Sequence, residues 1–223
     1  MNSIDSRKQS FHDLPLAAKN GQEKELEDLQ DYAESRGFEH DLAIYDVPFF
    51  KMKQRRTRLG ISDDDLRDFF PLPKVFNGIL KMVQSLFQIQ IEEVKDSASV
   101  WHPDVKLFRV VDADQRILGN FYFDPYIRDE KGYPGGDKGW FVPMRQNSGK
   151  AHSTPMGAMI LSLPTPGYGK PSLLNFEEVR ELLKTFGNML VHVVAQSEYA
   201  DLSGKTGVEA DALDVAANFM TQW

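Results

Sequence analysis

Hydrophobic residues recur at helical spacing in several segments of the chain. In residues 21–37, Leu26, Leu29 and Ala33 fall on one stripe, and Gly37 offers a C-terminal stop. Aspartates after Ser62 place negative charge in a first helical turn, where the helix dipole favours it. The same spacing predicts further helices over residues 47–58, 75–87 and 209–223.

From Ile89 the pattern changes to one typical of strands. Residues 89–94 alternate between apolar and polar, and residues 105–126 form two strand-like runs joined by a turn at 112–115. Residues 156–164 are a third apolar run, and residues 128–139 are so rich in glycine and charge that they read as loop. Helices followed by strands and then helices predict an α+β fold.

Residues 176–194, "FEEVRELLKTFGNMLVHVV", form the longest segment with helical periodicity in the second half of the chain. Asn175 can cap its amino end, and Glu177 and Glu178 stand in its first turn. We therefore expect a well-defined helix here.

Composition narrows the class of protein. The chain has 223 residues, of which 41% are hydrophobic, enough for a real core. Its net charge of −7 disfavours non-specific binding to nucleic acid or to anionic membranes. The basic run at 51–58 reads as a solvated helix face. No apolar run approaches the ~18 residues of a membrane span, and no signal core is expected at the amino end.

The absence of cysteine excludes three kinds of chemistry together. Disulfides, thiolate zinc sites and cysteine nucleophiles all need a sulfur that this chain lacks. The five histidines are scattered, and His192 is the one on the helix over 176–194. We interpret His192 as an ordinary helix residue rather than part of a relocated metal site.

Several short segments combine aromatic, acidic and glycine residues at fixed spacing. They are "YDVPFF" at 45–50, "FFPLPKVFNGIL" at 69–80, "VWHPDV" at 100–105, "FYFDPYIR" at 121–128 and the segments flanking 184–188. In this order they resemble the thimet oligopeptidase, neurolysin and oligopeptidase A family of zinc metallopeptidases. The resemblance implies a zincin-like peptidase core fragment, with helices packed around a small β-sheet, as a single domain over 21–223 after a separate segment at 1–20.

The family's active-site motif is His-Glu-Phe-Gly-His on a helix, with a glutamate on the following helix as third zinc ligand. Two histidines four residues apart lie on one helix face, so both can reach one zinc, and the glutamate between them serves as base. In this sequence the five positions read "KTFGN", from Lys184 to Asn188, and the third-ligand position falls at Asp214. The framework Phe-Gly is retained, whereas the motif is degenerate at every position that handles zinc or water.

The replacements bear directly on the expected chemistry. The ammonium of Lys184 has no lone pair to give a metal, and Thr185 cannot act as a base near neutral pH. Asn188 is a poor zinc ligand, and Asp214 is a methylene shorter than glutamate. These replacements predict no metal, no cofactor, no catalytic residue and a chain that is not an enzyme. Lys184 and Asp214 are expected to form an ion pair in the vacated site.

Three functions remain open. The first is a truncated, non-catalytic pseudopeptidase that serves as a structural or accessory subunit of a larger protein complex. The second is a metal-independent module that binds peptide along Met156 to Pro164, expected to be an exposed strand. The third, a remote one, is an active zinc oligopeptidase. Aromatic side chains expected to face a protein partner are Phe69, Phe70, Phe76, Phe87, Trp140, Phe141, Phe219 and Trp223.

The residues of one segment suggest where in the cell the protein is located. "FDPY" at 123–126 is similar to the plant and plastid-type branch of the family. This suggests an organelle, chloroplast or mitochondrion, with the cytoplasm as the alternative.

Overall fold

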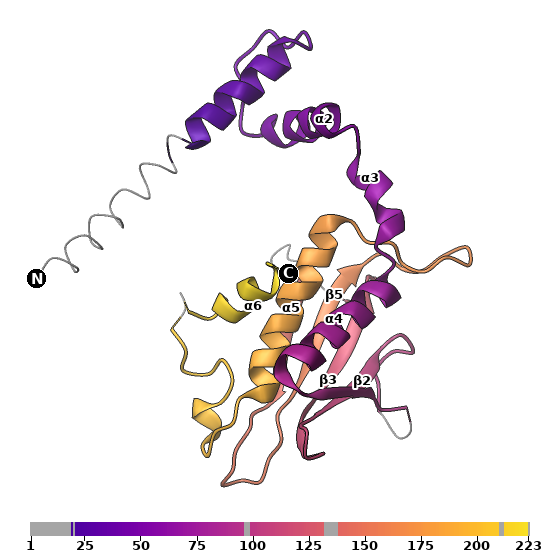
Figure 1. Cartoon of the computed structure of the whole chain (residues 1–223), viewed down its shortest axis with the longest axis vertical. Helices are drawn as coiled ribbons and strands as arrows, with labels where there is room; N and C mark the ends of the chain where they lie inside the picture. The colour runs from indigo at the N-terminus through magenta and orange to yellow at the C-terminus, as the bar shows by residue number, and fades with distance from the viewer. Residues whose placement is uncertain (1–18, 20, 96–98, 132–137, 210–211, 223) are drawn as a thin grey trace, which may run out of the picture. The chain divides into compact units, whose positions relative to one another are not determined.

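The computed structural model describes residues 19, 21–95, 99–131, 138–209 and 212–222 (Figure 1). The chain divides into two compact units, Met1–Asp65 and Leu66–Trp223. The single domain expected over 21–223 stays a prediction; within it, residues 21–65 belong to a compact unit with a small core of its own. The predicted segment 1–20 lies almost wholly outside the described residues.

The described residues of the first unit include one helix over residues 21–34 and a second, α2 (Val47–Leu59). Leu29, Ala33 and Phe50 form its buried core. The predicted helix stop at Gly37 is confirmed, since this residue has a φ of 84°, a conformation that glycine adopts without strain. The short helix α3 (Asp63–Leu66) follows at the boundary between the units.

The second unit contains a five-stranded sheet with two long helices. Its elements in chain order are η1 (Arg67–Phe69), α4 (Leu72–Phe87), β1 (Gln90–Glu93), β2 (Lys106–Val111), β3 (Ile117–Tyr126), β4 (Gly139–Arg145), β5 (Met156–Leu163), α5 (Phe176–Val194), η2 (Ala200–Leu202) and α6 (Val215–Met220). This mixed arrangement confirms the α+β class. The helix predicted over 209–223 is shorter than expected, because α6 begins only at Val215.

The order of strands in the sheet is β1-β2-β3-β5-β4. Strand β5 pairs in parallel with β3 on one side and antiparallel with β4 on the other. The prediction that Met156–Pro164 offers an exposed strand edge is therefore wrong, since both backbone edges of β5 are already hydrogen-bonded within the sheet. The terminal strand beside β5 is β4.

Strand β4 was not predicted, because its residues show little alternation of apolar and polar side chains. Pro143 interrupts it, and a proline inside an apolar run argues against a central strand. The backbone oxygen of Lys138 accepts from the Ser162 N–H at 2.8 Å, and pairing alternates along an antiparallel ladder. Gly139, Phe141 and Pro143 therefore direct their backbone groups away from β5, so the N–H that proline lacks is one the sheet does not need.

One face of the sheet is covered by α4 and α5. The Phe76 ring of α4 stacks on Phe123 of β3 with centroids 4.2 Å apart, and it meets Phe186 of α5 edge-on. Phe108 and Phe121 extend this aromatic layer along β2 and β3. The core of the unit therefore joins both helices to the central strands.

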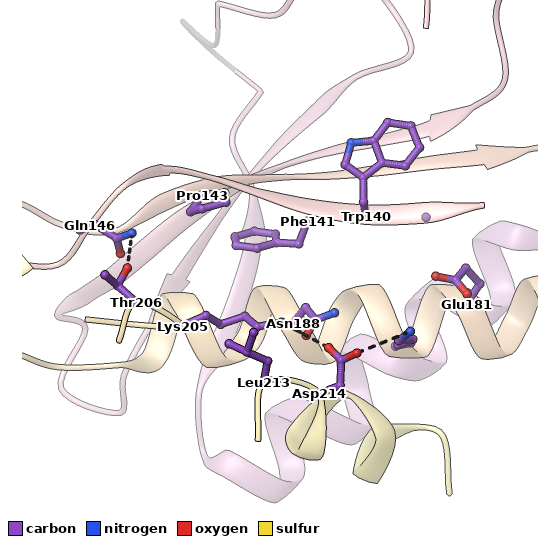
Figure 2. A pocket seen from close by; sticks show the side chains of 12 residues that line it. Trp140, Phe141, Pro143, Gln146, Glu181, Asn188, Lys205, Thr206, Leu213 and Asp214 are labelled. Atoms are coloured by element: carbon purple, nitrogen blue, oxygen red, sulfur yellow. Dashed lines mark hydrogen bonds and ion pairs between the residues drawn. The ribbon is translucent and has the colours of Figure 1, made fainter. Parts of the chain in front are cut away.

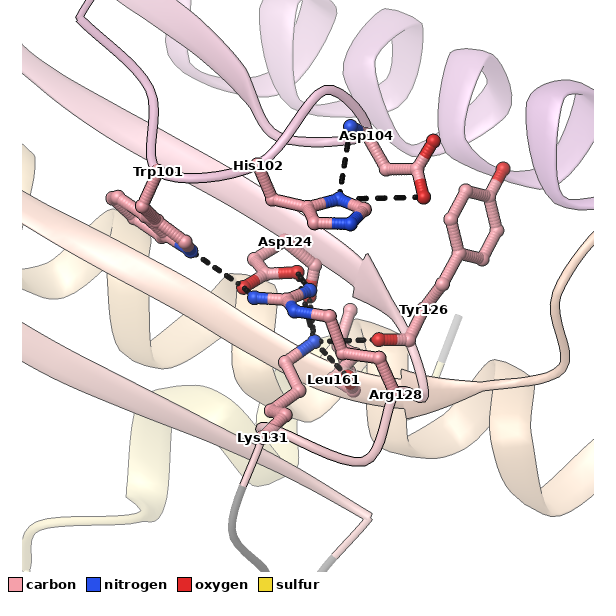
Figure 3. A network of polar contacts seen from close by, with 8 residues as sticks. All are labelled: Trp101, His102, Asp104, Asp124, Tyr126, Arg128, Lys131 and Leu161. Atoms are coloured by element: carbon pink, nitrogen blue, oxygen red, sulfur yellow. Dashed lines mark hydrogen bonds and ion pairs between the residues drawn. The ribbon is translucent and has the colours of Figure 1, made fainter.

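A buried ionic network stands at the end of β3 (Figure 3). The Asp124 carboxylate, 1% exposed, accepts two hydrogen bonds from the Arg128 guanidinium at 2.6 Å, one from Lys131 Nζ at 2.8 Å and one from the Trp101 indole at 3.0 Å. The Lys131 ammonium also donates to the backbone oxygens of Asp124, Tyr126 and Leu161. These bonds tie the chain after β3 to the neighbouring strand β5.

The aromatic residues expected on the surface differ in how exposed they are. Phe69, Phe87 and Phe219 are exposed, with Phe69 at 68%, whereas Phe70, Trp140 and Phe141 are partly buried. The expectation is wrong for Phe76, because this ring is buried among the phenylalanines of the core. Trp223 lies outside the described residues. Within the described part of the chain, no helix has the length and apolar character that crossing a membrane takes.

Candidate functional site

Helix α5 begins after Asn175, the predicted cap residue, and the structure shows a complete capping box there. The Asn175 side chain accepts from the Glu178 N–H, and the Glu178 carboxylate accepts from the Asn175 N–H, both at 2.8 Å. This exchange satisfies two backbone donors that a helix start leaves without partners. Glu178 also pairs with Arg67 at 3.4 Å. The start of α5 is thereby fixed.

The five residues from Lys184 to Asn188 divide between two sides of α5. Lys184 and Asn188, one turn apart, line a pocket, whereas Thr185, Phe186 and Gly187 are buried. Thr185 is 1% exposed and packs under β4, where a Cβ on Gly139 would stand 2.6 Å from its hydroxyl oxygen. The position that holds the catalytic glutamate in the resembled family is therefore closed off by this strand.

Gly187 allows α6 to lie directly against α5. A Cβ at this position would stand 2.8 Å from the Cα of Ala217 and 3.0 Å from Met220, closer than packed atoms tolerate. Phe186, next to it, is fully buried in the aromatic core. The retained Phe-Gly pair thus serves the packing of α5 against the core and α6.

The pocket lies between β4, α5 and the segment that leads into α6 (Figure 2). It is open to solvent and measures about 430 Å³. Its residues are Gly139, Trp140, Phe141, Pro143, Gln146, Glu181, Lys184, Asn188, Lys205, Thr206, Leu213 and Asp214. One wall is thus aromatic strand and the other is charged helix and loop.

The charged wall is held by a chain of polar contacts. Lys184 Nζ lies 3.8 Å from one oxygen of Asp214, and Lys205 Nζ lies 3.4 Å from the other. Lys205 also donates to the Asn188 side-chain oxygen at 2.9 Å. The expected Lys184–Asp214 ion pair is present, but the side chains are 39% and 49% exposed, so it is a pocket-wall pair rather than a buried one.

Sequence analysis missed Lys205. This residue lies between η2 and α6, 17 positions from Asn188. No motif or periodicity marks it, because it reaches the site only through the path of the loop.

His192 lies one turn beyond Asn188 on α5, outside the pocket lining, and its ring contacts the backbone of the sheet. Its Nε2 stands 3.0 Å from the Arg145 carbonyl oxygen and 3.2 Å from that of Met156, and carbonyls only accept, so Nε2 carries the proton. Burial lowers the pKa of the ring, and the two hydrogen bonds oppose that shift. His192 thus joins the end of β4 to the start of β5.

The zinc that the resemblance implies does not fit the residues present. Lys184 offers no lone pair, Thr185 is shut beneath β4, and the Asn188 oxygen already accepts from Lys205. Asp214 is the one carboxylate among the four motif positions. Nowhere in the described ranges do three or more histidine, cysteine, aspartate or glutamate side chains gather closely enough to hold a metal ion.

Comparison with known proteins gives consistent matches. The model of peptidase family M3 matches residues 1–223. Oligopeptidase A of Escherichia coli (strain K12) is 33% identical over 211 residues, which are 95% of this chain and 31% of that protein. Organellar oligopeptidase A, chloroplastic/mitochondrial, of Arabidopsis thaliana is 29% identical over 231 residues, 100% of this chain and 29% of that protein. Probable cytosolic oligopeptidase A of the same plant is 28% identical over 208 residues, 90% and 29% respectively.

These matches confirm the resemblance drawn from the short segments. The chain spans less than a third of the length of these relatives. The relatives include an organellar and a cytosolic protein, so both compartments suggested by the sequence are represented among them.

The prediction that the chain is not an enzyme is contradicted. The matching family is one of peptidases, and the relatives are named as oligopeptidases, so the family points to an enzyme. The prediction failed because it extended the chemistry of four side chains to a whole protein. Four replaced groups describe one metal-binding arrangement, and the chain corresponds to less than a third of each relative.

Proposed function

We propose that this chain, which belongs to peptidase family M3, binds extended peptides in the groove between strand β4 and helix α5. The observation that carries the proposal is the place of β4, the terminal strand of the sheet, which forms one wall of the pocket. Peptides are the class of substrate that the names of the relatives indicate.

The backbone of β4 is suited to accept a further strand. Gly139 and Phe141 direct their N–H and C=O groups away from β5, toward the side where a peptide can pair. Pairing along a terminal strand gives affinity through main-chain hydrogen bonds, and adjacent pockets select side chains. Trp140 and Phe141 supply aromatic surface beside this edge.

The fold around the groove supports a zincin-like assignment within the proposal. Helix α5 packs on the sheet beside β4 and carries Lys184, Thr185 and Asn188 at the motif positions, and Asp214 precedes α6. In this interpretation α5 is the degenerate counterpart of the zinc-binding helix. Peptide binding needs only the strand edge and the pocket, so it does not depend on zinc at these positions.

Backbone-methylated peptides test the proposal. We expect saturable binding of a labelled extended peptide, measured by fluorescence anisotropy. Methylation of the backbone nitrogens at one set of alternating positions should weaken binding at least tenfold, because it removes donors to β4. Methylation at the other set, whose N–H groups point away, is the matched control and should leave affinity nearly unchanged. Equal effects of both sets, or no saturable binding, would contradict binding along β4.

A second candidate is assembly into a larger protein complex. It is favoured by the exposure of Phe69, Phe87 and Phe219, each of which leaves about half or more of its surface in solvent. We expect the protein purified natively from its source to sediment with a partner, measured by analytical ultracentrifugation and mass spectrometry. Sedimentation as a free monomer at the lowest and highest accessible concentrations would exclude this candidate.

A further inference from the structure

The charged wall of the pocket holds two ammonium groups on either side of one carboxylate. Lys184 comes from α5 and Lys205 from the segment before α6, and each pairs with a different oxygen of Asp214. Figure 2 shows Asp214 and Lys205 on this wall. We propose that Lys184, Lys205 and the amide N–H2 group of Asn188 bind a carboxylate group of the peptide. The carboxylate is either the C-terminal one or that of an acidic side chain, and the proposal rests on the proposed peptide-binding function.

Asp214 interacts only weakly with the two lysines. Its oxygens stand 3.4 and 3.8 Å from the two ammonium nitrogens, whereas strong charge-assisted hydrogen bonds measure about 2.7–2.9 Å. Asp214 is also the N-cap residue of α6, yet its side chain makes no capping hydrogen bond. Because this carboxylate is half exposed and its ion pairs are long, its displacement by a better-aligned carboxylate costs little free energy.

The lysines have donors to spare for a ligand. An ammonium group has three N–H donors. Lys205 directs one to the Asn188 oxygen at 2.9 Å and another to Asp214 at 3.4 Å. The Lys184–Asp214 separation of 3.8 Å exceeds hydrogen-bond distance, so this pair uses none of the Lys184 donors. Because the Asn188 oxygen accepts from Lys205, the N–H2 group of that amide is a further donor on the same wall.

Positive and negative side chains are unevenly distributed along the pocket. Its four charged lining residues are Glu181, Lys184, Lys205 and Asp214, and their formal charges cancel. Figure 2 shows Glu181 toward one end of the pocket and Lys205 toward the other. A net attraction for anions is therefore absent, and a carboxylate is favoured locally at the Lys205 end. There the Gln146 amide donates to the Thr206 hydroxyl at 3.1 Å and ties β4's end to the loop.

The aromatic wall strengthens the interaction. Phe141 of β4 lies on the side of the strand that faces α5 and the lysines, whereas Trp140 projects from the opposite side of the strand (Figure 2). Apolar surface lowers the local dielectric, so an ion pair formed beside it is stronger than one in open water. A peptide paired with the outward backbone groups of Gly139 and Phe141 would lie beside this wall, with its carboxylate directed toward α5.

Three labelled peptides distinguish the sources of the carboxylate. The first two consist of alanine, valine and threonine, the first with a free C-terminal carboxylate and the second with a C-terminal amide. The third has a C-terminal amide and the same residues except for one internal glutamate. Fluorescence anisotropy with the full chain should show about tenfold weaker binding of the second peptide than of the first. Tight binding of the third identifies a side-chain carboxylate as the ligand, and tight binding of only the first identifies the C-terminus.

Substitutions in the protein test the assigned residues in both directions. Lys184→Gln and Lys205→Gln should each weaken binding of the carboxylate peptide about five- to tenfold and leave the second peptide unaffected. Asp214→Asn should tighten carboxylate binding severalfold, because it removes the internal competitor. A residue with a merely structural role would not give opposite signs. Lys81→Gln, at an exposed position on α4, changes the net charge equally and is the matched control.

The outcomes separate this inference from the proposed function. If all three peptides bind equally and Lys184→Gln, Lys205→Gln and Asp214→Asn have no effect, the carboxylate site is overturned while peptide binding stands. If none of the peptides binds, both are overturned. Weaker binding of every peptide to all three variants, with Lys81→Gln normal, would show a general structural effect and would also overturn the site.

Discussion

Replacing Asp124 by alanine is expected to lower the free energy of unfolding by about 3–5 kcal/mol, the range for removing one partner of a buried ion pair. The loss is large because the substitution leaves two cationic side chains without their carboxylate partner. The side chains of Lys131 and Arg128 are 5% and 17% exposed, and both form ion pairs with this carboxylate, at 2.8 and 2.6 Å. Urea unfolding followed by tryptophan fluorescence measures the effect, since the Trp101 indole donates to Asp124.

An exposed ion pair in the same unit provides the control. Arg180 and Glu177 stand 3.6 Å apart with side chains 50% and 68% exposed. Arg180→Gln should change the unfolding free energy by less than about 1 kcal/mol, as is usual for surface pairs. A loss at Asp124→Ala no larger than that at Arg180→Gln would show that the network does not stabilise the fold.

The same network gives a prediction for the dependence of stability on pH. Burial opposes ionisation of Asp124, but hydrogen bonds from Arg128, Lys131 and Trp101 together outweigh it and lower the pKa of the carboxyl below its usual value. A depressed pKa in the folded state adds stability that is fully present above the unfolded pKa of about 3.9 and is lost as pH falls through the folded pKa. The difference in stability between wild type and Asp124→Asn should therefore be constant near neutrality and shrink below about pH 4.

Sequence analysis succeeded where the determinants of structure are local. Asn175 caps α5 through the backbone N–H of a residue three positions on, and the glycine stop after the first helix is a single residue. Such features depend on neighbours in the chain, so a reading of the sequence finds them. The Lys184–Asp214 pair was also predictable, because the spacing of the resembled motif brings the two positions together.

The features that were missed depend on distant parts of the chain. Strand β5 lies between β3 and β4, so the order of strands in the sheet differs from their order in the chain. The terminal strand is therefore β4 rather than β5. Pro143 and the short exposed run around it hide the strand from pattern analysis. Lys205 joins the site through a loop, where side-chain placement follows from tertiary contacts rather than from periodicity.

The boundary between the two units also depends on contacts between residues far apart in the sequence. The sequence joins the helices of 21–65 to the rest because the family resemblance runs through both. In the structure Leu29, Ala33 and Phe50 close a small core within the first unit. A resemblance that spans a boundary does not reveal where one core ends and the next begins, since each core is defined by contacts rather than by motif order.

The second large effect on stability is expected at Gly187, where α5 and α6 meet. A Cβ at this position would stand 2.8 Å from the Cα of Ala217 and 3.3 Å from the Ala216 carbonyl oxygen. Backbone atoms cannot turn aside as a flexible side chain can, so α6 as a whole must shift. Gly187→Ala is expected to lower the free energy of unfolding by about 1–3 kcal/mol, the usual cost of overpacking a core.

Gly78 of α4 is the matched control, because it is an exposed helical glycine with no atom within 4 Å of where its Cβ would be. Gly78→Ala should raise the free energy of unfolding by about 0.5–1 kcal/mol, since alanine loses less conformational entropy in a helix. Opposite signs for the same chemical change, measured by urea unfolding, would show that close approach of α6 decides the outcome at Gly187. Equal stabilisation by both substitutions would mean that α6 does not pack against α5 at this glycine, and Asp214, which precedes α6, would then lose its support beside Lys184.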